Sequence, residues 1–142
     1  MKPRALLICP VHPARQQLVE VVRQTGTTHV VTASVREATT ALLNGKYDVI
    51  ISGRKLEDGN SDDLLRAAKA AQPGVPVVVV SRTGDWDEYV DAIERGAFDL
   101  LAADSPPSES ARIISNALRS SAGGRVAAPA VETKHKSRLG KL

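Results

Sequence analysis

Aromatic side chains are scarce in this chain of 142 residues, at 3% of the sequence. A core must therefore be aliphatic, and an apolar content of 42% is sufficient for one. Cysteine occurs once, at Cys9, which excludes an internal disulfide and a cysteine-based metal site. The longest apolar runs, such as residues 75–80, are far shorter than a membrane span, and no leader-like segment opens the chain. We expect a cytoplasmic protein with no membrane contact.

A basic face on the folded part is also missing. Residues 1–120 carry 14 basic and 15 acidic side chains, whereas residues 121–142 carry five basic residues and one acidic residue. The pI of about 9.2 therefore describes the C-terminal tail, which argues against a nucleic-acid-binding domain. Any contact with nucleic acid would be weak, non-specific and made by the tail. Its basic contacts would be Lys134, Lys136, Arg138 and Lys141.

Short apolar runs alternate with segments of helical periodicity along the chain. The runs predict strands over residues 5–9, 29–32, 47–52, 75–80 and 98–102. The intervening segments predict five helices, of which two begin at apparent capping boxes, Ser34 with Glu37 and Asp85 with Glu88. Asn60 or Ser61 is the expected cap of the third helix, and a proline follows Ser105 at the start of the last one.

This alternation predicts an α/β fold. Apolar strands joined by helical crossovers form a parallel sheet that is covered on both faces. Right-handed crossovers leave few topologies, and we predict a flavodoxin-like (βα)5 three-layer sandwich with strand order 2-1-3-4-5. The domain is placed at residues 1–120 and a flexible basic tail at residues 121–142. Ligands of such sheets bind at the carboxyl ends of the strands.

Four motifs, in this order and spacing, resemble the receiver domain of two-component response regulators. They are Tyr47-Asp48-Val49-Ile50-Ile51, the turn Leu56-Glu57-Asp58-Gly59, Val77-Val78-Val79-Val80-Ser81, and Gly96-Ala97-Phe98-Asp99-Leu100-Leu101. The resemblance covers residues 4–120. It implies a domain that is switched by phosphorylation of an aspartate after the third strand.

The residues that carry this chemistry in the family are replaced here. The resemblance places the phosphorylated aspartate at Gly53, which has no side chain to act as nucleophile. It places the acidic pair that holds Mg²⁺ at Pro10 and Val11, which offer no side-chain oxygen ligand for a hard cation. The lysine that neutralises the phosphoryl charge corresponds to Ala103.

Two further positions report or bind the phosphoryl group in the family. The hydroxyl that ends the fourth strand is present as Ser81, while the aromatic of the fifth strand is replaced by Leu100. We therefore predict no aspartyl-phosphate chemistry, no magnesium site of the family type, no cofactor and no catalytic residue. Ser81 is either a remnant phosphate contact or a side chain that satisfies backbone groups at a strand end.

Two other groups of residues have alternative interpretations. Arg54 and Lys55 could hold an anion, or they could be ordinary solvated charges. Trp86 and Tyr89, with Leu100 nearby in the family's docking face, could form a partner surface, or they could cover the edge of the core.

We predict a phosphorylation-incompetent receiver that acts as a protein–protein interaction or regulatory module in phosphorelay signalling, and not as an enzyme. The expected partner is a signalling protein or a second copy of the chain. Two alternatives remain open. One is a flavodoxin-like domain that binds a small ligand or anion, and the other is a nucleic-acid-associated regulator that acts through its tail.

Overall fold

A computed structural model describes residues 2–9 and 13–123 of the chain. The predicted tail contacts, Lys134, Lys136, Arg138 and Lys141, lie outside these residues, as do Pro10 and Val11. Within the described part, no helix is both long and apolar enough to cross a membrane.

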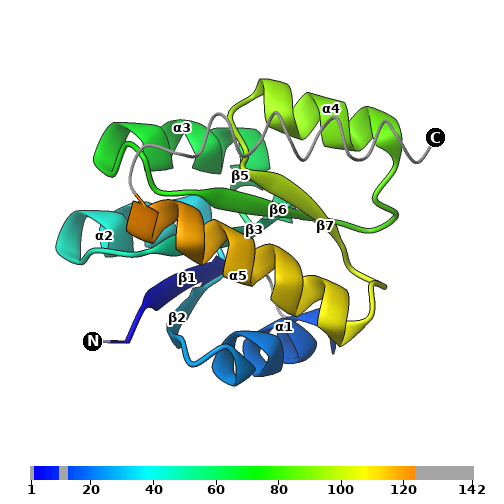
Figure 1. Ribbon diagram of the computed structural model, residues 1–142. Helices are drawn as coiled ribbons and strands as arrows, with labels where there is room; N and C mark the ends of the chain where they lie inside the picture. The colour runs from blue at the N-terminus through cyan, green and yellow to red at the C-terminus, as the bar shows by residue number, and fades with distance from the viewer. Residues whose placement is uncertain (1, 10–12, 124–142) are drawn as a thin grey trace.

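Five parallel strands form the central sheet, and their order confirms the predicted topology (Figure 1). The strands are β1 (Arg4–Ile8), β2 (Thr28–Thr32), β3 (Val49–Gly53), β6 (Val77–Ser81) and β7 (Asp99–Ala102). They lie in the order β2-β1-β3-β6-β7, which is 2-1-3-4-5 when the five strands are counted along the chain. The sheet therefore changes its direction of winding at β1 and β3, the point where ligands of such folds bind.

Five helices cover the two faces of this sheet (Figure 1). The helices α2 (Val35–Asn44), α3 (Ser61–Ala71) and α4 (Trp86–Glu94) pack on one face. The helices α1 (Pro13–Gln24) and α5 (Pro107–Gly123) pack on the other. The last helix thus continues past residue 120, where we placed the end of the domain.

The two faces of the sheet bury alternate residues of each strand. In β1, Leu6 and Ile8 lie in the cluster under α2, α3 and α4, whereas Ala5 and Leu7 lie in the cluster under α1 and α5. This two-sided burial explains why the strands read as continuous apolar runs. Each fully buried leucine or isoleucine contributes about 1.5–3 kcal/mol to folding, so an aliphatic core is sufficient without many rings.

Strand boundaries differ from the predicted ones by one or two residues, for local reasons. The third strand begins at Val49 instead of residue 47, because the Tyr47 amide donates to the Gln72 side chain at 3.1 Å. The fourth begins at Val77, since Pro76 has no amide to donate to a neighbouring strand.

Candidate functional site

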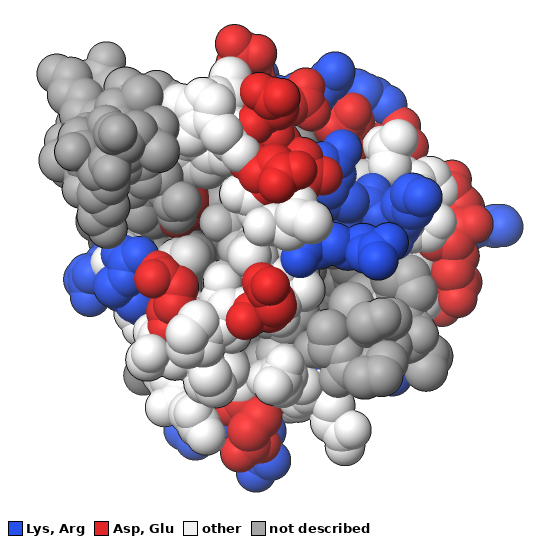
Figure 2. Space-filling view, turned by 90° about the vertical axis from the view of Figure 1, so that its right-hand side faces the viewer, with Lys and Arg blue, Asp and Glu red and all other residues white. Residues whose placement is uncertain are grey.

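The carboxyl ends of β3, β6 and β7 place three predicted site positions at one edge of the sheet. Gly53 pairs with Val80 across β3 and β6, and Ser81 pairs with Ala102 across β6 and β7. Ala103 follows at once, and its amide donates to the Ser81 carbonyl at 2.7 Å. Figure 2 views this end of the molecule, where acidic and basic side chains of the described residues lie next to one another.

Gly53 ends β3 without a side chain, and crowding does not explain this. A Cβ atom built there would lie 3.8 Å from the carbonyl oxygens of Ile8 and Lys55, which is ordinary contact. The neighbouring Ser52 is fully buried, and its hydroxyl donates to the Gly53 carbonyl at 2.9 Å. A side chain could therefore start from this position without a backbone clash, and the sequence does not supply one.

Asp58, the nearest acid along the loop, is engaged elsewhere. It lies in the turn of a short antiparallel hairpin, β4 (Lys55–Leu56) and β5 (Gly59–Asn60), which the sequence did not predict. Its carboxylate accepts from the amides of Val35 at 2.7 Å and Arg36 at 3.1 Å, at the N-terminus of α2. These backbone hydrogen bonds lower the pKa of Asp58. Asp58 is therefore a helix cap and does not face the end of β3 as a substitute nucleophile.

We expect Asp58→Ala to lower the urea midpoint of unfolding and to speed hydrogen exchange at the amides of Val35 and Arg36. Asp58→Asn keeps a capping oxygen but loses the charge, so its effect should be smaller.

Because folding lowers the pKa of Asp58, its contribution to stability is present at neutral pH and lost as the pH falls below about 4. The difference in urea midpoint between the wild type and Asp58→Asn should therefore disappear over that acid range. Glu57→Ala, at the exposed neighbouring position, is the control, and an equal effect there would contradict the assignment.

Ser81 is the centre of a compact hydrogen-bond network at the end of β6. The side chain is 1% exposed, and its hydroxyl donates to Glu88 Oε1 of α4. Ser81 Oγ also accepts from the amides of Gly84 at 3.0 Å and Thr83 at 3.3 Å. Ser81 therefore satisfies backbone groups at a strand end and also binds a carboxylate.

Glu88 accepts hydrogen bonds from residues at the ends of two strands, β3 and β6. Its Oε1 accepts from the hydroxyls of Ser81 and Thr83, and its Oε2 accepts from the Arg54 guanidinium at 2.6 Å. The Ser81 hydroxyl is the main cause that lowers the pKa of Glu88, and the charge of Arg54 adds to it. Glu88 is thus ionised at neutral pH and held by groups that follow β3 and β6.

The predicted anion contacts behave differently from each other. Arg54 does contact an anion, but that anion is the Glu88 carboxylate of the same chain. Lys55 lies in β4 with an exposed side chain and pairs through the backbone with Asn60. Of the two residues, Arg54 is the one whose side chain has a described contact at the end of the sheet.

One of the two predicted capping boxes, Asp85 with Glu88, does not form. Asp85 precedes α4 but makes no side-chain cap hydrogen bond. Glu88 would have completed that box, yet its carboxylate turns to Ser81, Thr83 and Arg54 instead. The other two caps are formed, by Ser34 on α2 and by Asn60 with Asp63 on α3, although Glu37 bonds the amide of Ala33 and not that of Ser34.

A second ionic contact holds the opposite end of α4. Arg95, the C-terminal cap residue of α4, lies 3.0 Å from Asp91 of the same helix and 3.5 Å from Asp62 of α3. These carboxylates raise the pKa of Arg95. Together with the Glu88 network, they attach α4 to the rest of the domain at both ends.

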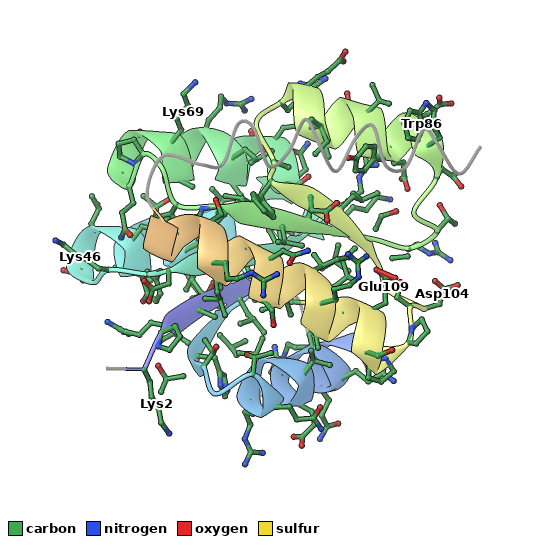
Figure 3. The ribbon with its side chains drawn as sticks, viewed as in Figure 1. Lys2, Lys46, Lys69, Trp86, Asp104 and Glu109 are labelled. Atoms are coloured by element: carbon green, nitrogen blue, oxygen red, sulfur yellow. The ribbon has the colours of Figure 1, made fainter. Side chains whose placement is uncertain are left out.

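The residues present do not fit the magnesium ion of a working receiver. Mg²⁺ requires several oxygen ligands in near-octahedral geometry. Gly53 has no side-chain oxygen, and Asp104, which follows Ala103, points to solvent (Figure 3). Across residues 2–9 and 13–123, no three side chains of His, Cys, Asp or Glu are grouped so that they could hold a metal.

The predicted partner surface is reduced to a single exposed residue. Trp86 is 37% exposed, whereas Tyr89 is 2% exposed and Leu100 is buried. The rings of Trp86 and Tyr89 stack with centroids 5.4 Å apart. A protein docked on this side of α4 would touch Trp86, near the end of the domain that carries Asp104 (Figure 3), but neither of the other two.

A sequence model of the response regulator receiver domain matches residues 10–115. The chain belongs to this family. The transcriptional regulatory protein GlrR of Escherichia coli is 28% identical over 122 residues, which are 85% of this chain and 28% of that protein. The response regulator protein PilR of Pseudomonas aeruginosa is 28% identical over 86 residues, which are 61% of this chain and 19% of PilR. This receiver thus spans less than a third of the length of either relative.

The fold agrees with solved receiver structures. The receiver domain of a sensor histidine kinase from Pseudomonas aeruginosa, solved with a magnesium ion coordinated in its active-site cleft, superposes with a TM-score of 0.71. The two sequences are 20% identical, and the match covers 83% of this chain and 98% of that one. At this identity the likeness establishes the receiver fold.

Proposed function

We propose that this receiver domain is not phosphorylated and acts as a protein–protein interaction module in two-component signalling. Gly53 at the end of β3 carries the proposal, because an aspartyl phosphate cannot form on a residue with no side chain. The loss of the lysine at Ala103 and the engagement of Ser81 by Glu88 support it. The domain presents a surface that includes Trp86 of α4, and any change in that surface would have to come from a bound partner or ligand instead of phosphorylation.

Small-ligand binding has less support. A cavity between α1, α5 and the end of β7 has a volume of about 20 Å³, which is room for roughly one water molecule. The nucleic-acid alternative depends on the tail, which lies outside the described residues. The interaction module is therefore the function that the geometry favours.

Incubation with acetyl phosphate and Mg²⁺, followed by intact-mass measurement, tests the proposal. The expected result is an unchanged mass under conditions in which a receiver that keeps its aspartate gains one phosphoryl group. A gain of one phosphoryl group by this chain would show that another side chain accepts it. Peptide mapping would then locate that residue.

A further inference from the structure

We propose that Arg54, Ser81 and Thr83 form an oxyanion-binding cluster that the Glu88 carboxylate keeps closed. A free tetrahedral oxyanion of the inorganic phosphate type would compete with Glu88 for these donors. Its binding would release the first turn of α4 from the end of the sheet. The inference deepens the proposed function and rests on it, because it assigns this position to reversible anion binding in place of covalent phosphorylation.

The donors of this cluster converge from the ends of two strands. Arg54 follows β3, Ser81 ends β6, and Thr83 lies in the loop that leads to α4. Both oxygens of one carboxylate are used, with two hydroxyls on Oε1 and the guanidinium on Oε2. Charge-assisted hydrogen bonds of this kind are about twice as strong as neutral ones, and the planar guanidinium suits phosphate as well as carboxylate. The same donors could therefore serve a different anion.

Solvent reaches this closed cluster. The side chain of Glu88 is 31% exposed and that of Arg54 is 41% exposed, so a dissolved anion can approach the pair. Gly53, next to Arg54, adds no side chain that would cover it. The position of Glu88 also allows it to leave, because Glu88 lies in the first turn of α4, which the N-cap residue Asp85 does not hold with a side-chain cap hydrogen bond.

Competition with a tethered carboxylate determines how strongly an anion binds. The apparent Kd for a ligand rises in proportion as the binding-competent state becomes rarer. If Glu88 occupies the donors for all but a tenth of the time, its removal should tighten phosphate binding about tenfold. The wild type should bind phosphate weakly, and the variant without the carboxylate should bind it measurably better.

The test is a titration with inorganic phosphate, followed by amide NMR at Arg54 and at residues 81–84. Four proteins are compared at constant ionic strength, with chloride as the balancing anion and without Mg²⁺. They are the wild type, Glu88→Ala, Asp87→Ala and the double variant Glu88→Ala with Arg54→Met. Asp87 is an exposed acid in the same helical turn, so its replacement removes the same charge and leaves the cluster closed.

We expect Glu88→Ala to bind phosphate with a Kd at least about tenfold lower than the wild type or Asp87→Ala. The added Arg54→Met change should abolish the gain. Equal Kd values in Glu88→Ala and Asp87→Ala would overturn the inference, since they would reflect general charge only. If the Glu88→Ala spectrum is not that of a folded domain, Glu88→Gln replaces it, and an unchanged Kd there would also count against the cluster.

These outcomes are separate from those of the phosphorylation test. Phosphate binding to the cluster is reversible and leaves the mass of the protein unchanged. A wild type that gains a phosphoryl group would contradict the proposed function. A Glu88→Ala variant that binds no phosphate would contradict only the inference drawn from the cluster.

Discussion

Replacing Tyr89 with alanine is expected to lower the free energy of unfolding by about 3–5 kcal/mol, the range for large aromatic residues removed from a core. Tyr89 is 2% exposed and lies in the cluster between α4 and the sheet. Few other rings are present to compensate for its loss. Because small domains are stable by only about 5–15 kcal/mol, this change should be visible as a large fall in the urea midpoint.

Trp86→Ala is the matched control for that experiment. Trp86 belongs to the same turn of α4 and stacks on Tyr89, but more than a third of it is exposed. Its loss removes the aromatic pair, about 0.5–1.5 kcal/mol, and the burial of the covered part of the ring, and should cost less than the loss of the fully buried Tyr89. If Tyr89 were a surface anchor, Tyr89→Ala would instead leave the midpoint almost unchanged. A partner that docks on α4 should lose affinity with Trp86→Ala, a change that leaves the domain folded.

Ser81→Ala is expected to cost about 2–3 kcal/mol of stability, more than loss of a typical surface hydroxyl. The hydroxyl is buried, donates to an ionised carboxylate and accepts from the amides of Thr83 and Gly84. Its removal leaves the two amides without that partner beneath the strand end, while water can still reach the partly exposed Glu88 carboxylate. Urea unfolding of the wild type and the variant at neutral pH measures the difference.

A double-mutant cycle with Glu88→Ala separates the Ser81–Glu88 contact from the rest. Residues in one hydrogen-bond network usually show a coupling of about 0.5–3 kcal/mol, and we expect about 1 kcal/mol here. Folding lowers the pKa of Glu88, so the coupling should be present at neutral pH and fade as the pH falls through that lowered pKa. Additive effects at neutral pH would mean that the hydroxyl and the carboxylate do not stabilise each other.

The fold could be predicted from the sequence because its signals are local and repeated. Continuous apolar runs such as Val77–Ser81 identify strands that are buried on both faces, and capping residues such as Ser34 mark where helices begin. The hairpin of β4 and β5 was missed because each of its strands has only two residues and no hydrophobic periodicity. It forms with Asp58 bound to the N-terminus of α2, a contact between residues far apart in the sequence.

The candidate site was predicted only in part. The positions of Gly53, Ser81 and Ala103 follow from where the strands end, which the family resemblance located. The role of Glu88 could not be read in this way, because an acid three residues after Asp85 is typical of a capping box. Its real partners, Ser81 and Arg54, meet it only after α4 folds against the ends of β3 and β6. Arg54 was the one available signal. It directly follows Gly53, where the family has its carboxylate, and a cation at that place favours an anion nearby.

The central claim is that the end of β3 no longer performs phosphoryl chemistry. A two-dimensional ¹H–¹⁵N NMR spectrum with and without Mg²⁺ and beryllofluoride, a mimic of the aspartyl phosphate, tests it most directly. We expect the peaks of Gly53, Ser81 and Ala103 to stay in place when both additives are present. A saturable shift of these peaks that requires Mg²⁺ would contradict the claim and return the domain to the class of phosphorylated switches.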